Sequence, residues 1–182
     1  MTVQEFKEYD HSFDETNFIT KVNNIIVKYF NSITLNEIDK VDHFVGDKVF
    51  ETGKRIIKDA EDNGCVHMFD ELNIRGTNIN SIDMDENAYY IHVRTELLYM
   101  DYLLDKKTGK LVSGDNSKRT SHLMIMTFKK NRNATEQTLV RTCPTCGASL
   151  NTNNTGICEY CHTVYDQENH DWVLEEIAGF DY

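Results

Sequence analysis

The sequence predicts an α+β protein whose helices pack on one face of an antiparallel sheet, and three observations support this class. Apolar residues recur at three- and four-residue spacing through the first third of the chain. From about residue 65 the apolar period changes to two, as in half-buried strands. Two Cys-x-x-Cys pairs and one further short apolar run complete the chain. Helices followed by a run of strands are typical of the α+β class.

The first helix is predicted over residues 13–32. Ser12 and Glu15 have the spacing of a capping box, which would satisfy free backbone N–H groups at the start of this helix. The apolar residues that follow have helical spacing and predict one buried face, formed by Phe18, Val22, Ile25, Ile26, Tyr29 and Ile33.

Two further helices are predicted before the sheet. Thr34 and Glu37 repeat the capping pattern and predict a short helix that starts there. A third run, from Val49 to Ala60, keeps the helical period and ends at Asn63 and Gly64. Glycine adopts the left-handed conformation that commonly ends a helix, so we expect the third helix to stop here.

The middle of the chain predicts strands. Residues 88–104 form a long strand with one mostly apolar face, and residues 65–83 form a strand-rich stretch before it, with a bulge or bend at Gly76. The apolar face of the long strand is Tyr89, Ile91, Val93, Leu97 and Leu103, and its polar face begins with Tyr90, His92, Arg94 and Glu96. The other predicted strands are a short one around Leu111 and Val112, one over Thr120 to Lys130, and a last one over Trp172 to Ile177.

Composition limits the classes of protein that remain. The 182 residues are 40% hydrophobic and carry a net charge of −11, which predicts a soluble globular domain with one appendage. No stretch reaches the roughly 18 apolar residues of a membrane span, and residues 1–10 lack the pattern of a signal peptide. We therefore expect a cytoplasmic protein, with peripheral attachment to a membrane as an open alternative. The acidic charge disfavours nucleic acid as a partner.

The four paired cysteines predict a structural zinc site. Cys143 and Cys146 form one Cys-x-x-Cys pair, and Cys158 and Cys161 form the second. Zinc prefers four thiolate ligands in a tetrahedron, and each tight turn offers two of them. Four protein ligands leave no open position for water, so we expect Zn²⁺ to stabilise the segment rather than to catalyse a reaction.

Other uses of these cysteines stay open. They are two disulfides, a redox pair, and an iron centre with the same ligands. Cys65 lies far from both pairs and is predicted to be a buried core thiol. The segment itself is acidic, since residues 134–182 carry eight acidic residues and one basic residue. A zinc ribbon that contacts a protein, or one that only braces the fold, therefore fits better than one that binds nucleic acid.

A basic strip lies between Lys106 and Arg132. It carries eight basic residues against Asp115 alone. One interpretation is a solvated hairpin whose lysines discourage pairing with other strands. The other is a docking surface for an acidic partner or for lipid headgroups, so contact with a membrane through residues 106–132 is a hypothesis.

The chain as a whole resembles a known family. The run LLYMDYLLDKKTGKLVSG, the cysteine pairs and Trp172-Val173-Leu174 after them resemble bacterial zinc-ribbon transport proteins with a Tim44-like domain, similar to the C-terminal domain of the mitochondrial import-motor scaffold. The resemblance implies a cone like nuclear transport factor two, with a zinc ribbon inserted before the last strand. The implied domains are residues 1–133 plus 170–182 for the cone and 134–169 for the ribbon. It also suggests a role in transport or at a membrane.

Two function classes follow from these expectations. The first is a non-catalytic binding or scaffold module that takes an apolar ligand or a segment of another protein. The alternative is a small-molecule enzyme of the isomerase, cyclase or dehydratase type that uses the cone cavity. Polar candidates to line that cavity are His92, Arg94, Glu96, Tyr99, Asp101 and His122. In the alternative interpretation, His92, Arg94 and Glu96 form the solvated face of a strand and Asp101 pins a turn.

Overall fold

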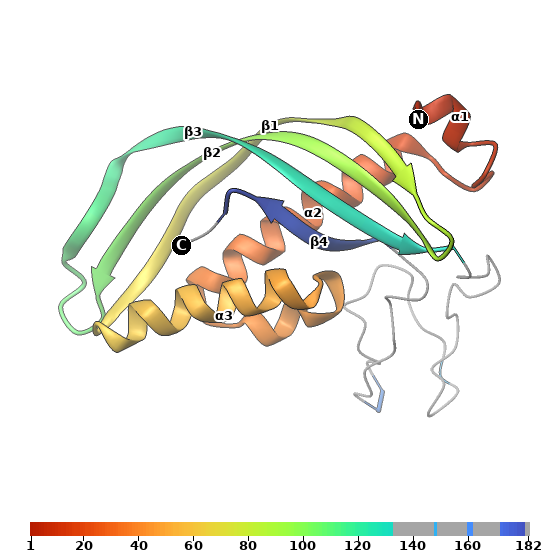
Figure 1. Cartoon of the computed structure of the whole chain (residues 1–182). Coiled ribbons are helices and arrows are strands. Elements are labelled where there is room, and N and C mark those ends of the chain that lie inside the picture. The colour runs from red at the N-terminus through yellow and green to blue at the C-terminus, as the bar shows by residue number, and fades with distance from the viewer. Residues whose placement is uncertain (133–147, 149–159, 162–171, 181–182) are drawn as a thin grey trace.

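The fold is a curved antiparallel sheet with helices on its concave face. A computed structural model describes residues 1–132, 148, 160–161 and 172–180 of the chain. The elements are α1 (Val3–Phe6), α2 (Glu15–Thr34), the 3-10 helix η1 (Ile38–Phe44), α3 (Asp47–Asp62), β1 (Cys65–Met84), β2 (Ala88–Asp105), β3 (Leu111–Asn131) and β4 (Val173–Ala178). The strands pair antiparallel in the order β1-β2-β3-β4, and α2 and α3 lie beneath the arch of the sheet (Figure 1). The α+β class and the packing of helices on one sheet face are confirmed.

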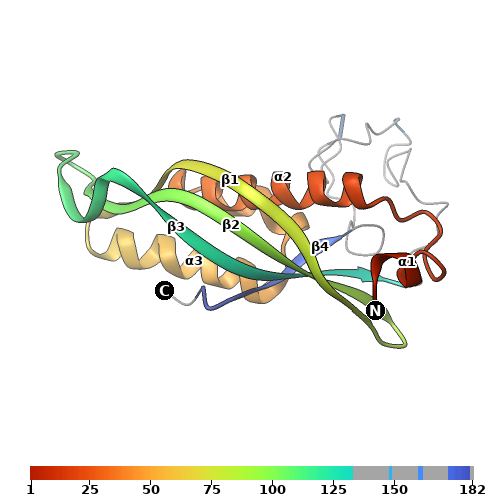
Figure 2. The same cartoon turned by 90° about the horizontal axis from the view of Figure 1, so that it is seen from above.

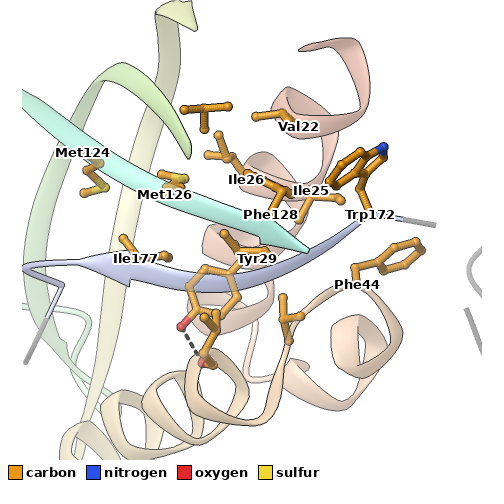
Figure 3. Packing of buried hydrophobic residues seen from close by; sticks show 14 of the residues in the cluster. Val22, Ile25, Ile26, Tyr29, Phe44, Met124, Met126, Phe128, Trp172 and Ile177 are labelled. Atoms are coloured by element: carbon orange, nitrogen blue, oxygen red, sulfur yellow. Dashed lines mark hydrogen bonds between the residues drawn. The ribbon is translucent and has the colours of Figure 1, made fainter. Parts of the chain in front are cut away.

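The core forms where the apolar face of α2 meets the concave face of the sheet. All six predicted α2 core residues are buried. From the sheet, Ile91, Val93 and Leu97 of β2 join them, and Met126 and Phe128 of β3 lie over the helix (Figure 3). Each large apolar side chain buried in this way contributes about 1.5–3 kcal/mol relative to an exposed one. The predicted division of β2 into an apolar and a polar face is confirmed at its first half.

The start of α2 differs from the prediction. Asp14, rather than Ser12, is the N-cap, and its carboxylate accepts the backbone N–H of Asn17 at 2.7 Å. Ser12 donates its hydroxyl to Asp10 at 2.6 Å. Both residue types are good caps, and the nearby Asp10 carboxylate engages the serine.

The predicted cap at Thr34 is also wrong. Thr34 is the last residue of α2, and its hydroxyl accepts the backbone N–H of Phe69 in β1 at 3.0 Å. The second helix is a 3-10 helix that begins only at Ile38. The third helix ends as predicted, because α3 stops at Asp62 and Gly64 has a φ of +68°. A local pattern thus identified the helix end, while a tertiary contact decided the role of Thr34.

The strands are longer than predicted. Leu111–Asn131 is one strand rather than two, and it carries three more residues than β2 between the pairs Tyr99↔Thr120 and Asp101↔Asp115. Gly114 lies directly beside this irregular part, paired with Tyr102, and has a φ of +82°. A Cβ there would lie 2.3 Å from the carbonyl oxygen of Asp101. Only glycine fits this close approach of two backbones.

The N-terminal segment covers one end of the sheet and was not predicted as a helix. Thr2 and Glu5 form a complete capping box around the single turn of α1. Phe6 is fully buried and packs edge-on against the ring of Tyr89, with ring centroids 5.0 Å apart. In the same segment, Asp10 Oδ2 lies 2.7 Å from Lys130 Nζ, and both side chains are largely buried. This ion pair ties the segment before α2 to the end of β3.

The Asp10 ion pair predicts acid sensitivity. Burial raises the pKa of Asp10, but hydrogen bonds and charge from Lys130 and hydrogen bonds from Ser12 outweigh it and bring the pKa below the ordinary 3.8. The ionised carboxylate therefore stabilises the fold above about pH 4, and this stability is lost as the pH falls through the folded pKa. Asp10→Asn is expected to lower the free energy of unfolding near neutral pH by on the order of 2 kcal/mol.

Urea denaturation near pH 7 and near pH 3 checks this prediction. Because Asp10→Asn has no carboxylate to protonate, it should lose less stability between the two pH values than the unmodified protein. Glu86→Gln, a change at an exposed acid in the β1–β2 turn, is the matched control and should behave like the unmodified protein. Equal losses in the unmodified protein and Asp10→Asn would contradict the assignment.

Several predictions concern residues outside the described part of the chain. Of the predicted ribbon, residues 134–169, only Ala148, Tyr160 and Cys161 are described. The strand predicted to follow it is confirmed as β4, whereas the division into cone and ribbon stays a prediction. No helix in the described residues has both the length and the apolar character needed to cross a membrane.

Candidate functional site

The predicted metal ligands are largely outside the described residues. Cys143, Cys146 and Cys158 are not described, while Cys161 is described and half-buried. Within the described ranges, no three His, Cys, Asp or Glu side chains form a group that could hold a metal ion. The zinc site therefore stays a prediction. Cys65, in contrast, is buried with 3% exposure, as predicted for a core thiol.

Three of the predicted cavity residues face away from the helices. His92, Arg94 and Glu96 lie on the convex face of the sheet, because they alternate along β2 with the core residues. His92 contacts the hydroxyl of Thr127 at 2.9 Å and the carboxylate of Asp83 at 3.2 Å. The assignment of these three residues to an internal cavity is wrong, and their alternative assignment to a solvated strand face is confirmed.

The other three predicted residues share the concave face. Tyr99 is 1% exposed and belongs to the apolar core, so it does not line a polar cavity. His122 stacks on the Tyr99 ring, with centroids 4.3 Å apart and planes 11° from parallel. Asp101 pairs in register with Phe69 of β1. Residues directly opposite each other point to the same face of a sheet, which places Asp101 beside the helix layer.

Asp101 forms a close pair with His67, a residue that the sequence did not single out. Their side chains are 2.8 Å apart, from Nε2 of His67 to Oδ1 of Asp101, and only 11% of the His67 side chain is exposed. The His67 ring also stacks on Phe69 at 4.4 Å. In the alternative interpretation Asp101 caps or pins a turn, but that role belongs to Asp105, whose carboxylate accepts the backbone N–H groups of Lys107 and Thr108.

An apolar groove opens beside this pair, where α2 and α3 end and β1 begins. Its volume is about 210 Å³. The side chains that make it apolar are Ile33, Leu35, Ile57, Ala60, Cys65 and Val66. Asn36 and Lys106 form its polar rim, and both donate hydrogen bonds to Glu61, at 2.9 and 3.2 Å. The groove therefore combines an apolar floor with a rim that is already hydrogen-bonded.

The size of the groove limits what it can hold. Pockets for whole small molecules measure about 300–1,000 Å³, so this groove fits a smaller apolar group. Leu35 is 63% exposed at its edge, which leaves apolar surface in contact with water. A hydrocarbon chain end or one or two apolar side chains of another protein would cover Leu35 and fill the groove. Its chemistry is that of apolar binding.

The predicted basic strip divides into two groups in space. Lys106, Lys107, Lys110, Lys118 and Arg119 lie at the β2–β3 hairpin, whereas Lys129, Lys130 and Arg132 lie at the other end of β3. The ten residues between Lys118 and Lys129 separate the two groups by roughly 35 Å of extended strand. Three of the bases form ion pairs within the described chain, Lys106 with Glu61, Arg119 with Glu71, and Lys130 with Asp10. Contact with a membrane through this segment stays a prediction.

Comparison with known proteins identifies the family. The solved structure of the intermembrane space region of the chloroplast protein ARC6 is similar at 10% sequence identity and a TM-score of 0.37, over 62% of this chain and 83% of that one. No curated protein matches the chain. The family model described as the Tim44-like domain matches residues 1–140. That match includes α1 to α3 and β1 to β3, and the chain belongs to the Tim44-like domain family.

Proposed function

We propose that this protein is a non-catalytic binding or scaffold module whose groove at the ends of α2 and α3 takes an apolar ligand or an apolar segment of another protein. The observation that carries the proposal is the convergence of apolar side chains from α2, α3 and β1 at an open groove. Concave apolar surface that is left in contact with water marks binding sites more often than structural defects.

A link to transport or to a membrane is the finer part of this proposal. Membership of the Tim44-like domain family supports it, since the sequence resemblance points to the scaffold of a mitochondrial import motor. The curved sheet and its helices also fit the cone of nuclear transport factor two that the resemblance implies. Peripheral attachment to a membrane is proposed on the same grounds, and a cytoplasmic location is proposed because paired thiols that bind a metal are typical of a reducing compartment.

A structural zinc ion is the second part of the proposal. Cys143, Cys146, Cys158 and Cys161 supply the ligand number and the ligand type that zinc prefers. Such an ion would hold together a segment of the chain that has few apolar residues of its own. Its ligands leave no position for a substrate, which agrees with a binding function.

An enzyme of the isomerase, cyclase or dehydratase type is the second candidate. One observation favours it, since the 2.8 Å pair of His67 and Asp101 could exchange a proton with a bound molecule. Such chemistry needs a closed pocket that excludes water. The groove is open at Leu35 and holds only about 210 Å³, so binding is the better-supported function.

Binding of the neutral fluorophore N-phenyl-1-naphthylamine tests the groove, because its phenyl ring is an apolar group small enough to enter while the rest of the molecule covers Leu35 at the edge. Its fluorescence rises on transfer to an apolar site, and a titration gives its dissociation constant. Leu35→Glu places a charge at the groove edge and is expected to weaken binding by about tenfold, since one buried apolar contact is worth about 1.5 kcal/mol or more. Val112→Glu, which changes an equally exposed apolar residue on the β2–β3 hairpin, is the matched control.

The groove assignment predicts that only the Leu35 variant loses binding. Equal binding by both variants and the unmodified protein would contradict it. The enzyme alternative makes a different prediction, in which purified protein converts a small molecule and Asp101→Asn abolishes the conversion. Turnover of that kind would replace the binding function with catalysis.

A further inference from the structure

A second groove lies on the convex face of the sheet, which no described helix covers (Figure 2). Its volume is about 390 Å³. It is lined by Arg75, Asn78 and Asn80 of β1, Arg94 and Glu96 of β2, and Leu123 of β3. This groove is separated by the full thickness of the sheet from the apolar groove at the helix ends.

The irregular register of β1 brings two arginines to this groove. Arg94 pairs with Asn78, and Glu96 pairs with Gly76. Arg75 is the extra residue of the bulge between Ile74 and Gly76. A bulge redirects the side chain of its extra residue, and here it places Arg75 in the same groove as Arg94.

Both guanidinium groups are available to a ligand. Among the described residues, neither the Arg75 nor the Arg94 guanidinium group makes a hydrogen bond or an ion pair. Glu96 is the acid among the residues that line the groove, and its carboxylate accepts the hydroxyl of Ser121 at 2.9 Å. Two guanidinium groups are thus set against one carboxylate. Asn78 and Asn80 add neutral amide groups. The groove is therefore locally positive in a chain whose net charge is −11.

Leu123 adds an exposed apolar side chain to the groove. Leu123 pairs with Glu96 and is 57% exposed on the β3 side. Arg119 of β3 is not free to add its charge, since it forms an ion pair with Glu71 of β1 at 3.6 Å. An occupant would thus meet two guanidinium groups, two amides, the Glu96 carboxylate and one apolar side chain.

We propose that this convex groove binds an extended, acidic and partly apolar segment of a partner protein. A guanidinium binds a carboxylate through two parallel hydrogen bonds, and Leu123 offers a contact for an apolar residue of the same segment. The net charge of −11 repels polyanions at long range. A short peptide with a few carboxylates suffers this repulsion less than a nucleic acid, which carries one charge per about 1.7 Å of helix axis.

Binding of two rhodamine-labelled peptides tests the proposal. The first peptide has about 12 residues and repeats Glu-Leu-Ser. The second has the same length and repeats Gln-Leu-Ser. Fluorescence anisotropy at low salt should show that the full chain binds the acidic peptide at least about tenfold more tightly than the neutral one, because charge-assisted hydrogen bonds contribute about 1.5–3 kcal/mol each.

Double variants distinguish binding of the peptide in the groove from general electrostatic attraction of the peptide to the protein. Arg75→Gln combined with Arg94→Gln should weaken binding of the acidic peptide by about tenfold or more. Lys107→Gln combined with Lys110→Gln removes the same charge at the exposed β2–β3 hairpin and should change the affinity by less than about threefold. Arg94→Lys keeps the charge but loses the planar fork, and it should give an intermediate loss.

Three outcomes would overturn the proposal. The first is equal binding of the two peptides, or of neither. The second is an equal loss in the arginine and lysine double variants. The third is the absence of peptide binding together with binding to vesicles of phosphatidylcholine and phosphatidylglycerol that depends on Arg75 and Arg94, which would assign the groove to a membrane. Circular dichroism with unchanged melting temperatures shows that each variant is folded.

Discussion

Replacing Phe30 with alanine is expected to lower the free energy of unfolding by about 4 kcal/mol, since truncating a buried phenylalanine costs about 3–5 kcal/mol. Phe30 is fully buried. Its ring centroid lies 5.0 Å from that of Phe69, 5.3 Å from Phe180 and 5.5 Å from Tyr99. These neighbours come from β1, β2 and the residues after β4, so a cavity at Phe30 weakens contacts among separate parts of the fold.

The surrounding rings prevent the cavity from closing. Aromatic pairs in edge-on contact are stiff and depend on one geometry, so the neighbours of Phe30 have little freedom to move inward. A loss of about 4 kcal/mol removes much of the 5–15 kcal/mol by which a typical domain is stable. We therefore expect Phe30→Ala to be partly unfolded at physiological temperature.

Urea denaturation followed by circular dichroism measures this effect. Val27→Ala is the matched control, because Val27 lies one turn earlier on the exposed side of α2 and is 37% exposed. Its replacement should change the free energy of unfolding by less than about 0.5 kcal/mol. Similar losses in the two variants would mean that α2 does not pack against the sheet through the face described above.

The secondary structure was predicted correctly where the period of the apolar residues alone determines it. The spacing of apolar residues in α2 and the alternation in β2 are local signals, and they assigned correctly the buried face of α2 and the two faces of the first half of β2. The caps were not, because Ser12 and Thr34 have hydroxyls that bind elsewhere in the folded chain. The single turn of α1 is too short to show a period, and its stability comes from burial of Phe6.

The His67–Asp101 pair and the convex groove depend on the register between neighbouring strands, which cannot be predicted from the sequence of one strand. His67 meets Asp101 because Phe69 pairs with Asp101. The irregularity predicted at Gly76 is confirmed as a bulge, but only the pairing of β1 with β2 places its extra residue, Arg75, in the same groove as Arg94. A shift of the pairing by one residue would move each of these side chains to the opposite face of the sheet. Local sequence gives the face pattern within a strand but leaves the pairing between strands open. The cysteine pairs are different, since two ligands three residues apart are a local motif.

Removal of zinc is expected to have the largest effect on the segment that carries the cysteines. Elemental analysis of purified protein should find about one Zn²⁺ per chain, and Cys143→Ser or Cys158→Ser should remove most of it. Bound zinc contributes on the order of 10 kcal/mol to the folding of small zinc sites, so a strong chelator should unfold residues 142–165. Cys65→Ser is the control and should keep the metal, because Cys65 is buried beside α2 and α3.

Trypsin reports on this change at one position. Arg141 is the only basic residue between residues 134 and 182, so cleavage there releases a peptide of residues 142–182 that trypsin does not cut further. The peptide, identified by mass spectrometry, should appear rapidly after chelation and slowly in the zinc-bound protein, since proteolysis follows the population of locally opened states.

Other results of the elemental assay would change the assignment. If the assay finds iron, the four cysteines still form a metal site, but the metal is not zinc. If the cysteines form disulfides, there is no metal site. Metal-free protein whose Arg141 resists trypsin would show that the four cysteines fold this segment without an ion.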